Sequence, residues 1–331
     1  MKIIFFSAKQ YDIKSFNRSN QQFKHSLRYV EEKLSINSLS MINNEKAICV
    51  FVNDVIDKEV ITGLVNKGVQ IVALRCAGFN NIDLDAARLI GLKVVRVPAY
   101  SPYAVAEHAL CLMLSLNRKV YRSYNRVREG DFTLKGLLGF DFHGRTIGII
   151  GTGKIGAVLA GIVSSMGMRV VACDLVENQL CIDLGVEYMS LSKLLSVADV
   201  VSLHCPLTDK TNHIINDDAI KLMKNNVMII NTGRGALLDT CAVIEGLKTK
   251  KIGYLGMDVY EQEGDIFFQD MTCEIIEDDI FERLLTFHNV LITPHQGFFT
   301  EEALKNIADT TLKSVEYFEN DKALLNEVSV N

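Results

Sequence analysis

The stretch that decides the fold is TIGIIGTGKIG, residues 146–156. Residues 146–150 predict a buried strand, and glycines follow at 151, 153 and 156, ahead of a helix-compatible run that ends near Met166. In this context the first glycine permits a tight turn, the second lets the backbone approach a pyrophosphate, and the third lets helix and strand pack closely. The stretch therefore predicts a dinucleotide-binding βαβ unit, in which backbone amides and the positive end of the helix hold the phosphates.

The residue after the next candidate strand decides between the two nicotinamide dinucleotides. The strand at 169–173 ends at Asp174, at the distance from Gly156 where an acid that binds the adenosine ribose belongs. A carboxylate accepts hydrogen bonds from the 2′-hydroxyl and repels a 2′-phosphate, and Leu175 and Val176 supply no cation for that phosphate. We therefore predict NAD rather than NADP, with a plain glycine turn and a helix-capping aspartate as the alternative.

Apolar runs that look like strands alternate with helical segments along most of the chain, which is typical of parallel α/β sheets. Pro98, Pro102 and a continuous helical pattern over 103–128 separate two series of candidate strands. The first series comprises 2–6, 47–52, 69–74 and 92–97, and the second comprises 146–150, 169–173, 200–204, 227–231, 254–258 and 290–293. An amphipathic helix is predicted over 300–319. We expect an α/β fold with a small open sheet first and a dinucleotide-binding sheet second.

The composition is that of an ordinary globular protein with room for about two domains. The 331 residues carry a net charge of −5, and neither sign forms a long block, so we expect no nucleic-acid or membrane-surface partner. The eight cysteines are scattered without CxxC pairs, which predicts reduced thiols in the cytoplasm and no bound metal. The first apolar run stops at Lys9, too early for a signal peptide, and the apolar run 147–168 contains Lys154 and the glycines explained above, so we expect no membrane span.

Three polar residues lie at or just past the C-terminal ends of candidate strands, where open α/β sheets place ligands: Arg234, Glu263 and His295. Glycines on both sides leave the Arg234 guanidinium uncrowded for bidentate binding of a carboxylate. A carboxylate beside an imidazole orients the ring and favours its protonated form, which makes it a proton donor near neutral pH. Each residue alone also fits a plainer role, as a surface arginine, a solvated acid and a packed core histidine. Together they predict a catalytic set beside a nicotinamide.

Motifs in the same order along residues 75–295 resemble those of the D-isomer-specific 2-hydroxyacid dehydrogenases, most closely the fermentative NAD-dependent D-lactate dehydrogenases. The resemblance rests on RCAGFNNID (75–83), VPAYSP (97–102), the glycine motif, HCPLT (204–208), NTGRG (231–235), DVYEQE (258–263) and TPH (293–295). It implies that Arg234, Glu263 and His295 are catalytic. It implies cofactor contacts at Gly151, Gly153, Lys154, Ile155, Gly156, Asp174, Cys205, Pro206, Asn212, Thr232, Gly233 and Asp258, the last fixing the nicotinamide carboxamide. Substrate contacts are implied at Ala77, Gly78, Tyr100, Arg234 and Phe298.

The resemblance also implies a discontinuous architecture of two doubly wound parallel-sheet domains with a cleft between them. Residues 1–100 and 298–331 would form a flavodoxin-like substrate domain, and residues 101–297 a Rossmann domain for NAD. The expected small-molecule reaction is reversible reduction of pyruvate to D-lactate by NADH, with His295 as acid and base, while Phe298 and Phe299 could restrict the substrate side chain. The alternatives are a broader D-2-hydroxyisocaproate-type dehydrogenase and an NADH-sensing binding protein. The helical pattern over 103–128 resembles the family's dimer contact, so a homodimer or higher homo-oligomer is expected.

Overall fold

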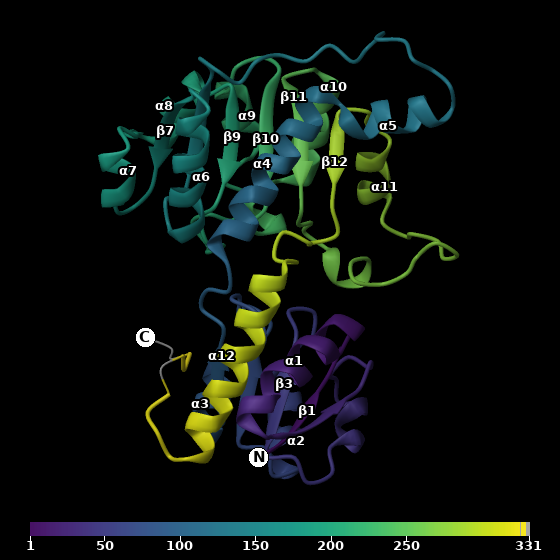
Figure 1. The fold of residues 1–331 in the computed structure, drawn as a ribbon, viewed down its shortest axis with the longest axis vertical. Helices are drawn as coiled ribbons and strands as arrows, with labels where there is room; N and C mark the ends of the chain where they lie inside the picture. Colours follow the sequence, from purple (N-terminus) through teal and green to yellow (C-terminus); the bar gives the residue numbers. More distant parts are fainter. Residues whose placement is uncertain (325, 329–331) are drawn as a thin grey trace. The chain divides into compact units, whose positions relative to one another are not determined.

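The computed structural model describes residues 1–324 and 326–328. The chain divides into two compact units, here called unit 1 (Met1–Ser101 with Phe298–Asn331) and unit 2 (Pro102–Gly297). Both ends of the chain therefore contribute to unit 1, while unit 2 is formed by one continuous segment (Figure 1).

Unit 1 is built on a five-stranded parallel sheet in the order β2-β1-β3-β4-β5, the doubly wound order of flavodoxin-like folds. Its strands are β1 (Lys2–Phe5), β2 (Ser26–Tyr29), β3 (Ala47–Val50), β4 (Ile71–Leu74) and β5 (Lys93–Arg96). Its helices are α1 (Gln10–Phe23), η1 (Asn37–Met41), α2 (Lys58–Asn66), α3 (Leu84–Ile90) and α12 (Glu301–Glu319). Helix α12 packs on α1 (Figure 1). It also packs on β4, and α2 packs on α3 and η1. Strands β3 and β4 are apolar along their whole length because helices cover the sheet.

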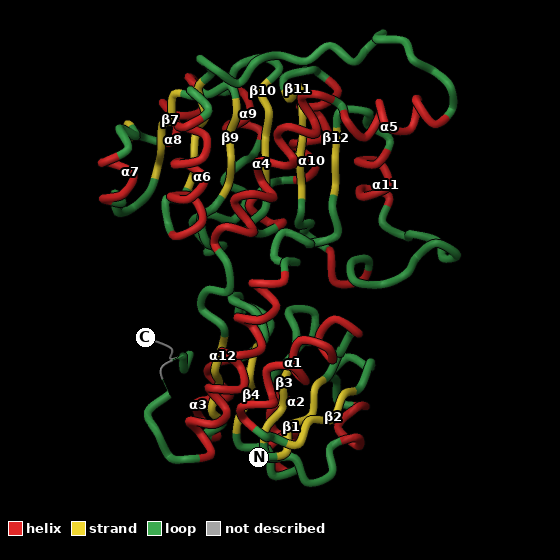
Figure 2. The backbone as a smooth tube through the Cα atoms, viewed as in Figure 1, coloured by secondary structure: helices red, strands yellow, loops and turns green. Residues whose placement is uncertain are grey.

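Unit 2 contains a seven-stranded sheet in the order β12-β11-β10-β9-β6-β7-β8, and every strand pair in it is parallel. Its strands are β6 (Thr146–Ile150), β7 (Arg169–Cys173), β8 (Glu187–Tyr188), β9 (Val200–Leu203), β10 (Val227–Asn231), β11 (Ile252–Met257) and β12 (Val290–Ile292). The order reverses at β6, which places the glycine turn at the switch point where such sheets bind ligands. Figure 2 shows these strands running side by side between helices.

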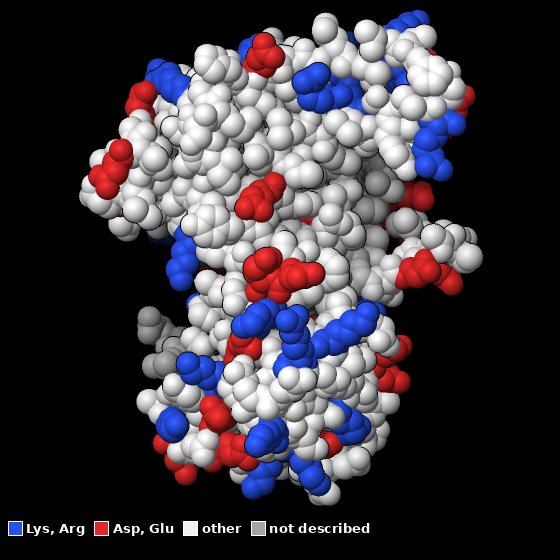
Figure 3. Space-filling view, viewed as in Figure 1, with Lys and Arg blue, Asp and Glu red and all other residues white. Residues whose placement is uncertain are grey.

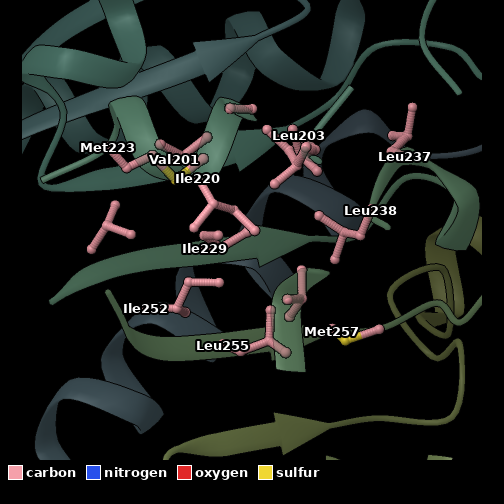
Figure 4. Packing of buried hydrophobic residues seen from close by; sticks show 14 of the residues in the cluster. Val201, Leu203, Ile220, Met223, Ile229, Leu237, Leu238, Ile252, Leu255 and Met257 are labelled. Carbon is pink, nitrogen blue, oxygen red and sulfur yellow. The ribbon is translucent and has the colours of Figure 1, made fainter. Parts of the chain in front are cut away.

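Two apolar layers cover the sheet of unit 2. Helices α4 (Pro102–Arg118), α6 (Lys154–Ser165) and α7 (Gln179–Asp183) contribute to one layer. The other layer contains side chains of α8 (Leu191–Val197), α9 (Asp217–Leu222), α10 (Thr240–Lys248) and α11 (Asp279–Leu285), and Figure 4 shows part of it. The remaining elements are α5 (Val120–Arg128), η2 (Gly235–Leu237) and η3 (Glu263–Asp265). The predicted α/β class with two parallel sheets is confirmed.

The structure corrects the sequence analysis in three places. The helical pattern over 103–128 is two helices, because Lys119 adopts a left-handed conformation with φ 51° and separates α4 from α5. At this break the Lys119 ammonium donates to the carbonyl of Leu138 at 2.6 Å. Strands β2 and β8 were not predicted; both are short and partly exposed.

Side chains of both charges lie on the visible face of the molecule (Figure 3). On the face shown in Figure 3, basic and acidic side chains are interspersed over each unit. In residues 1–324 and 326–328, no helix has the length and apolar character that crossing a bilayer requires. The eight cysteines, all in the described part of the chain, are free thiols.

Candidate functional site

The glycine turn after β6 is built from close backbone contacts. Gly151 has φ +93°, and a Cβ there would lie 2.4 Å from the backbone nitrogen of Cys205. A Cβ at Gly156 would lie 2.0 Å from the carbonyl oxygen of Gly151. Around Gly153, by contrast, no described heavy atom beyond its chain neighbours lies within 4 Å of the position that a Cβ would take. Helix α6 begins at Lys154, the first of the two residues predicted to contact the cofactor through their backbone, and no side chain caps its N-terminus. The turn thus leaves an open approach to uncapped first-turn amides, which fits a dinucleotide pyrophosphate.

Asp174 lies directly after β7 at the mouth of this turn. Its carboxylate accepts hydrogen bonds from the Thr152 amide at 2.5 Å, the Thr152 hydroxyl at 3.1 Å and the Leu175 amide at 2.6 Å. The residue is exposed, and Leu175 and Val176 beside it are largely exposed apolar side chains. This arrangement fixes a carboxylate between the glycine turn and an apolar surface, as recognition of an adenosine ribose requires.

The loop after β9 approaches the same turn. It contains the predicted cofactor residues Cys205, Pro206 and Asn212, of which Cys205 is half-buried and the other two are exposed. Burial raises the pKa of the Cys205 thiol to about 11, so it stays neutral. Burial also lowers the pKa of His204 to about 4, and the ring of His204 is hydrogen-bonded to the Ser202 hydroxyl at 2.8 Å. His204 belongs to the motif HCPLT (204–208), which by itself indicates no role for its side chain.

Arg234 is held by the turn that follows β10. The Asn231 side chain accepts from the Gly233 amide at 3.0 Å and donates to the Arg234 carbonyl at 2.8 Å. One terminal nitrogen of the Arg234 guanidinium donates to the Gly233 carbonyl at 2.8 Å, and the residue is half-buried. The neighbouring Thr232 hydroxyl is buried and has no hydrogen-bond partner among residues 1–324 and 326–328. A ligand beside this turn would satisfy that hydroxyl, which fits the predicted cofactor contact.

The side chains of His295 and Glu263 lie in hydrogen-bond contact. Nδ1 of His295 lies 2.8 Å from Oε1 of Glu263, and both side chains are mostly buried. The second carboxylate oxygen of Glu263 accepts from the Tyr260 amide at 3.1 Å. His295 has φ +54°, a conformation that non-glycine residues rarely adopt, and the Phe268 ring centroid lies 5.8 Å from that of the imidazole. The imidazole is therefore fixed in orientation by a carboxylate that is itself held by backbone.

Asp258 lies under the turn that carries His295. Its carboxylate is buried and accepts from the Thr293 hydroxyl at 2.5 Å and from the amides of Gln296 at 2.8 Å and Gly297 at 2.7 Å. The ring of His108 lies 3.2 Å from the same carboxylate. Burial alone would raise the pKa of Asp258, but the hydrogen bonds from His108 and Thr293 hold it below the ordinary value. This structural role was not foreseen, and the contact of Asp258 with a nicotinamide carboxamide stays a prediction.

The predicted substrate residues other than Arg234 belong to unit 1. Tyr100 and Phe298 lie together, with ring centroids 6.2 Å apart, and the Phe51 ring centroid lies 6.1 Å from that of Phe298. The loop at Ala77 and Gly78 follows β4 and is held by hydrogen bonds to the carbonyl oxygen of each residue.

A buried guanidinium, that of Arg75, follows β4 directly. Arg75 is fully buried, donates to the Ser7 carbonyl at 2.8 Å and lies over the Phe51 ring at 4.9 Å. Its ion pair with Asp12 spans 3.4 Å. The sequence signal that could have identified Arg75 is a charged residue directly after an apolar strand.

Comparison with known proteins agrees with this geometry. Residues 110–297 match the family model described as the NAD-binding domain of the D-isomer-specific 2-hydroxyacid dehydrogenases. The D-lactate dehydrogenase of Escherichia coli K12 is 49% identical over 99% of this chain and 100% of its own length, and the apo-structure of the D-lactate dehydrogenase from Escherichia coli matches with a TM-score of 0.92. That structure is 48% identical and covers 99% of this chain and 100% of its own.

Two further solved structures extend the comparison. The structure described as the pyruvate reductase of Chlamydomonas reinhardtii matches with a TM-score of 0.93 at 40% identity and covers 98% of each chain. The D-lactate dehydrogenase from Lactobacillus jensenii, solved with NAD+, matches with a TM-score of 0.83 at 31% identity over 100% of each chain. This chain therefore belongs to the D-isomer-specific 2-hydroxyacid dehydrogenase family, is an enzyme of the D-lactate dehydrogenase type, and uses NAD as its cofactor.

Proposed function

We propose that this protein reduces pyruvate to D-lactate with NADH, reversibly, with His295 as the acid and base. The observation that carries the proposal is the hydrogen-bond contact between His295 Nδ1 and Glu263 at 2.8 Å, in the same NAD-binding unit as the Arg234 turn. Relatives named D-lactate dehydrogenase and pyruvate reductase support the choice of substrate.

In this proposal Arg234 binds the substrate carboxylate and polarises the adjacent carbonyl, because a guanidinium presents two parallel donors to a carboxylate. NADH supplies the hydride when bound. His295 donates a proton to the carbonyl oxygen through Nε2, since Nδ1 is bound to Glu263. Glu263 holds the ring and stabilises the imidazolium before the proton leaves. In the oxidative direction the neutral ring accepts the hydroxyl proton.

Unit 1 would act as the substrate domain. We propose that the amides of Ala77 and Gly78 receive the carboxylate, and that Tyr100 and Phe298 line the pocket for the substrate side chain. Phe298 is buried against Phe51, so this wall is rigid and favours a side chain as small as methyl. Discrimination by apolar walls is worth about 1–3 kcal/mol per methylene, which makes rejection of larger 2-oxoacids partial rather than complete.

The deciding experiment is a panel of 2-oxoacids with NADH, in which the chirality of the product is determined. We expect pyruvate to give the highest kcat/KM and the product to be D-lactate. Faster turnover of 2-oxoisocaproate would favour the broader dehydrogenase, and NADH binding without turnover of any 2-oxoacid would favour a sensing protein. Arg234→Lys should be severely impaired although it keeps the charge, because an ammonium cannot form the planar two-point contact.

We also propose a homodimer or higher homo-oligomer located in the cytoplasm. The free state of the cysteines supports a reducing compartment. Apolar side chains exposed on α4 and α5, namely Tyr103, Leu114, Val120, Tyr124 and Val127, support an interface there. Light scattering at several protein concentrations would measure the oligomeric state.

A further inference from the structure

A second histidine–carboxylate pair lies in unit 2, separate from the pair formed by Glu263 and His295. Oε1 of Glu261 lies 2.7 Å from Nε2 of His213. Oε2 of Glu261 accepts from the Thr240 amide at 3.1 Å and also from the Thr240 hydroxyl. Both carboxylate oxygens are thus used, and each binds a different segment of the chain.

The three segments that Glu261 joins all carry proposed site residues. His213 follows Asn212 in the loop after β9, Thr240 begins α10 shortly after Arg234, and Glu261 itself lies two residues before Glu263. A carboxylate at the first turn of α10 also interacts favourably with the positive end of that helix. Glu261 therefore links the loops that carry the cofactor contact, the guanidinium and the acid.

Backbone contacts press the same segments together. A Cβ at Gly235 would lie 2.0 Å from the Tyr260 carbonyl carbon and 2.3 Å from the Glu261 amide nitrogen. The His213 amide donates to the Ala236 carbonyl at 2.8 Å.

The residues that follow Gly235 anchor the Arg234 turn in the apolar core. Leu237 and Leu238 are fully buried in the apolar layer of unit 2 (Figure 4). The turn that carries Arg234 is thus held by two sets of contacts: Leu237 and Leu238 in the core, and the hydrogen bonds of Glu261.

We propose that Glu261, through His213 and Thr240, is a positioning residue that fixes the Arg234 turn relative to Glu263. The inference rests on the proposed function insofar as it takes Arg234 to bind the substrate carboxylate. A guanidinium displaced by a fraction of an ångström keeps its charge but loses its two-point contact with a carboxylate, so the main effect falls on 2-oxoacid binding.

The test compares Glu261→Gln with His213→Asn, the double variant and a matched control. Glutamine keeps the shape of Glu261 but removes its charge and one acceptor oxygen. Asparagine at 213 is short enough to lose the contact, yet tolerates the left-handed backbone there, φ +51°. The control is Glu245→Gln, which removes the carboxylate of an exposed ion pair with Lys248 at 2.6 Å on α10.

We expect Glu261→Gln to raise KM for pyruvate by about 10- to 10²-fold, with the NADH dissociation constant changed by less than about twofold. Because both single variants break the same contact, their effects on KM should be strongly non-additive. Glu245→Gln should leave both constants unchanged. A Glu261→Gln protein that loses thermal stability while keeping wild-type KM for pyruvate would show a purely structural role and overturn the proposal.

Hydrogen exchange provides a readout that does not need activity. Peptides covering 211–215 and 234–240 should exchange roughly tenfold faster in Glu261→Gln, as expected from loss of a hydrogen bond to a charged group. Unchanged exchange in both peptides would overturn the proposal.

If the wild-type protein reduced no 2-oxoacid, the proposed function would be wrong, whereas the exchange data would still decide whether Glu261 holds the turn. If Glu261→Gln does not fold, His213→Asn decides in its place, because it leaves the contacts of Glu261 with Thr240 intact.

Discussion

Replacing Asp258 by asparagine should uncouple the turn that carries His295 from the sheet beneath it. The buried carboxylate accepts from the Gln296 amide at 2.8 Å with one oxygen and from the Gly297 amide at 2.7 Å with the other. An asparagine has only one acceptor, so its NH2 group must face one of these N–H donors. At least one charge-assisted hydrogen bond is lost, and one buried donor remains unpaired.

The loss of a hydrogen bond to a charged group and the unpaired donor together cost about 2–4 kcal/mol in the free energy of unfolding of unit 2. The left-handed backbone of His295 adds to the effect, since such a conformation costs about 1–3 kcal/mol and persists only where the surroundings impose it. A relaxed turn would move the imidazole away from Glu263. We therefore expect kcat/KM for pyruvate to fall by about 10²-fold.

Urea unfolding and initial rates of NADH oxidation by pyruvate measure the two effects in Asp258→Asn. The matched control is Asp57→Asn, at the N-cap of α2, where the side chain accepts one bond from the Val60 amide at 2.9 Å. Asparagine and aspartate are equivalent N-caps, so the control should change the free energy of unfolding by less than about 0.5 kcal/mol. If Asp258→Asn unfolded like the control, or lost stability while keeping wild-type kcat/KM, the coupling described here would be refuted.

Three other predictions follow from single contacts. Because burial lowers the pKa of His204 to about 4, the unfolded chain binds a proton that the folded chain does not between about pH 6.5 and pH 4. The free energy of unfolding should therefore fall by at most about 3 kcal/mol as the pH drops through this window, and His204→Asn should flatten that slope in urea titrations. Asp174→Asn should narrow the preference for NADH over NADPH by about tenfold or more, because it removes the charge that repels a 2′-phosphate; an unchanged ratio of kcat/KM values would contradict the assignment. Gly235→Ala should destabilise the protein by about 1–3 kcal/mol, since the added Cβ meets the Tyr260 backbone at 2.0 Å, whereas Gly153→Ala, in open space, should keep its melting temperature.

The order of elements could be predicted wherever a strand is buried on both faces. Every residue of β6 and β10 is buried, and most of their side chains are apolar, so their sequences indicate them directly. Strand β8 has only two residues, and β2 is partly exposed, so neither leaves a periodic signal. The break at Lys119 could not be seen, because the helical pattern continues through it and only the backbone conformation changes.

The candidate site likewise contains residues that the sequence could predict and contacts that only the structure shows. Arg234, Glu263 and His295 follow strand ends, and a doubly wound sheet makes such positions conspicuous. The contacts of Asp258 and Glu261 join segments far apart in the sequence, so only the folded chain shows what these carboxylates hold. Arg75 was quoted within a motif, yet its burial and its contact with the Phe51 ring required the structure.

Unit 1 is assembled from two separate segments of the chain, so it cannot complete its fold until α12 has been synthesised. When a ribosome has made the first 300 residues, every strand of both sheets has been translated. Unit 2 has its whole segment by then, but α1 and β4 still lack α12, whose buried stripe includes Ile307, Leu312 and Val315. Until that helix emerges, the nascent chain exposes an apolar sheet face, the kind of surface that chaperones bind and that aggregates when translation stalls.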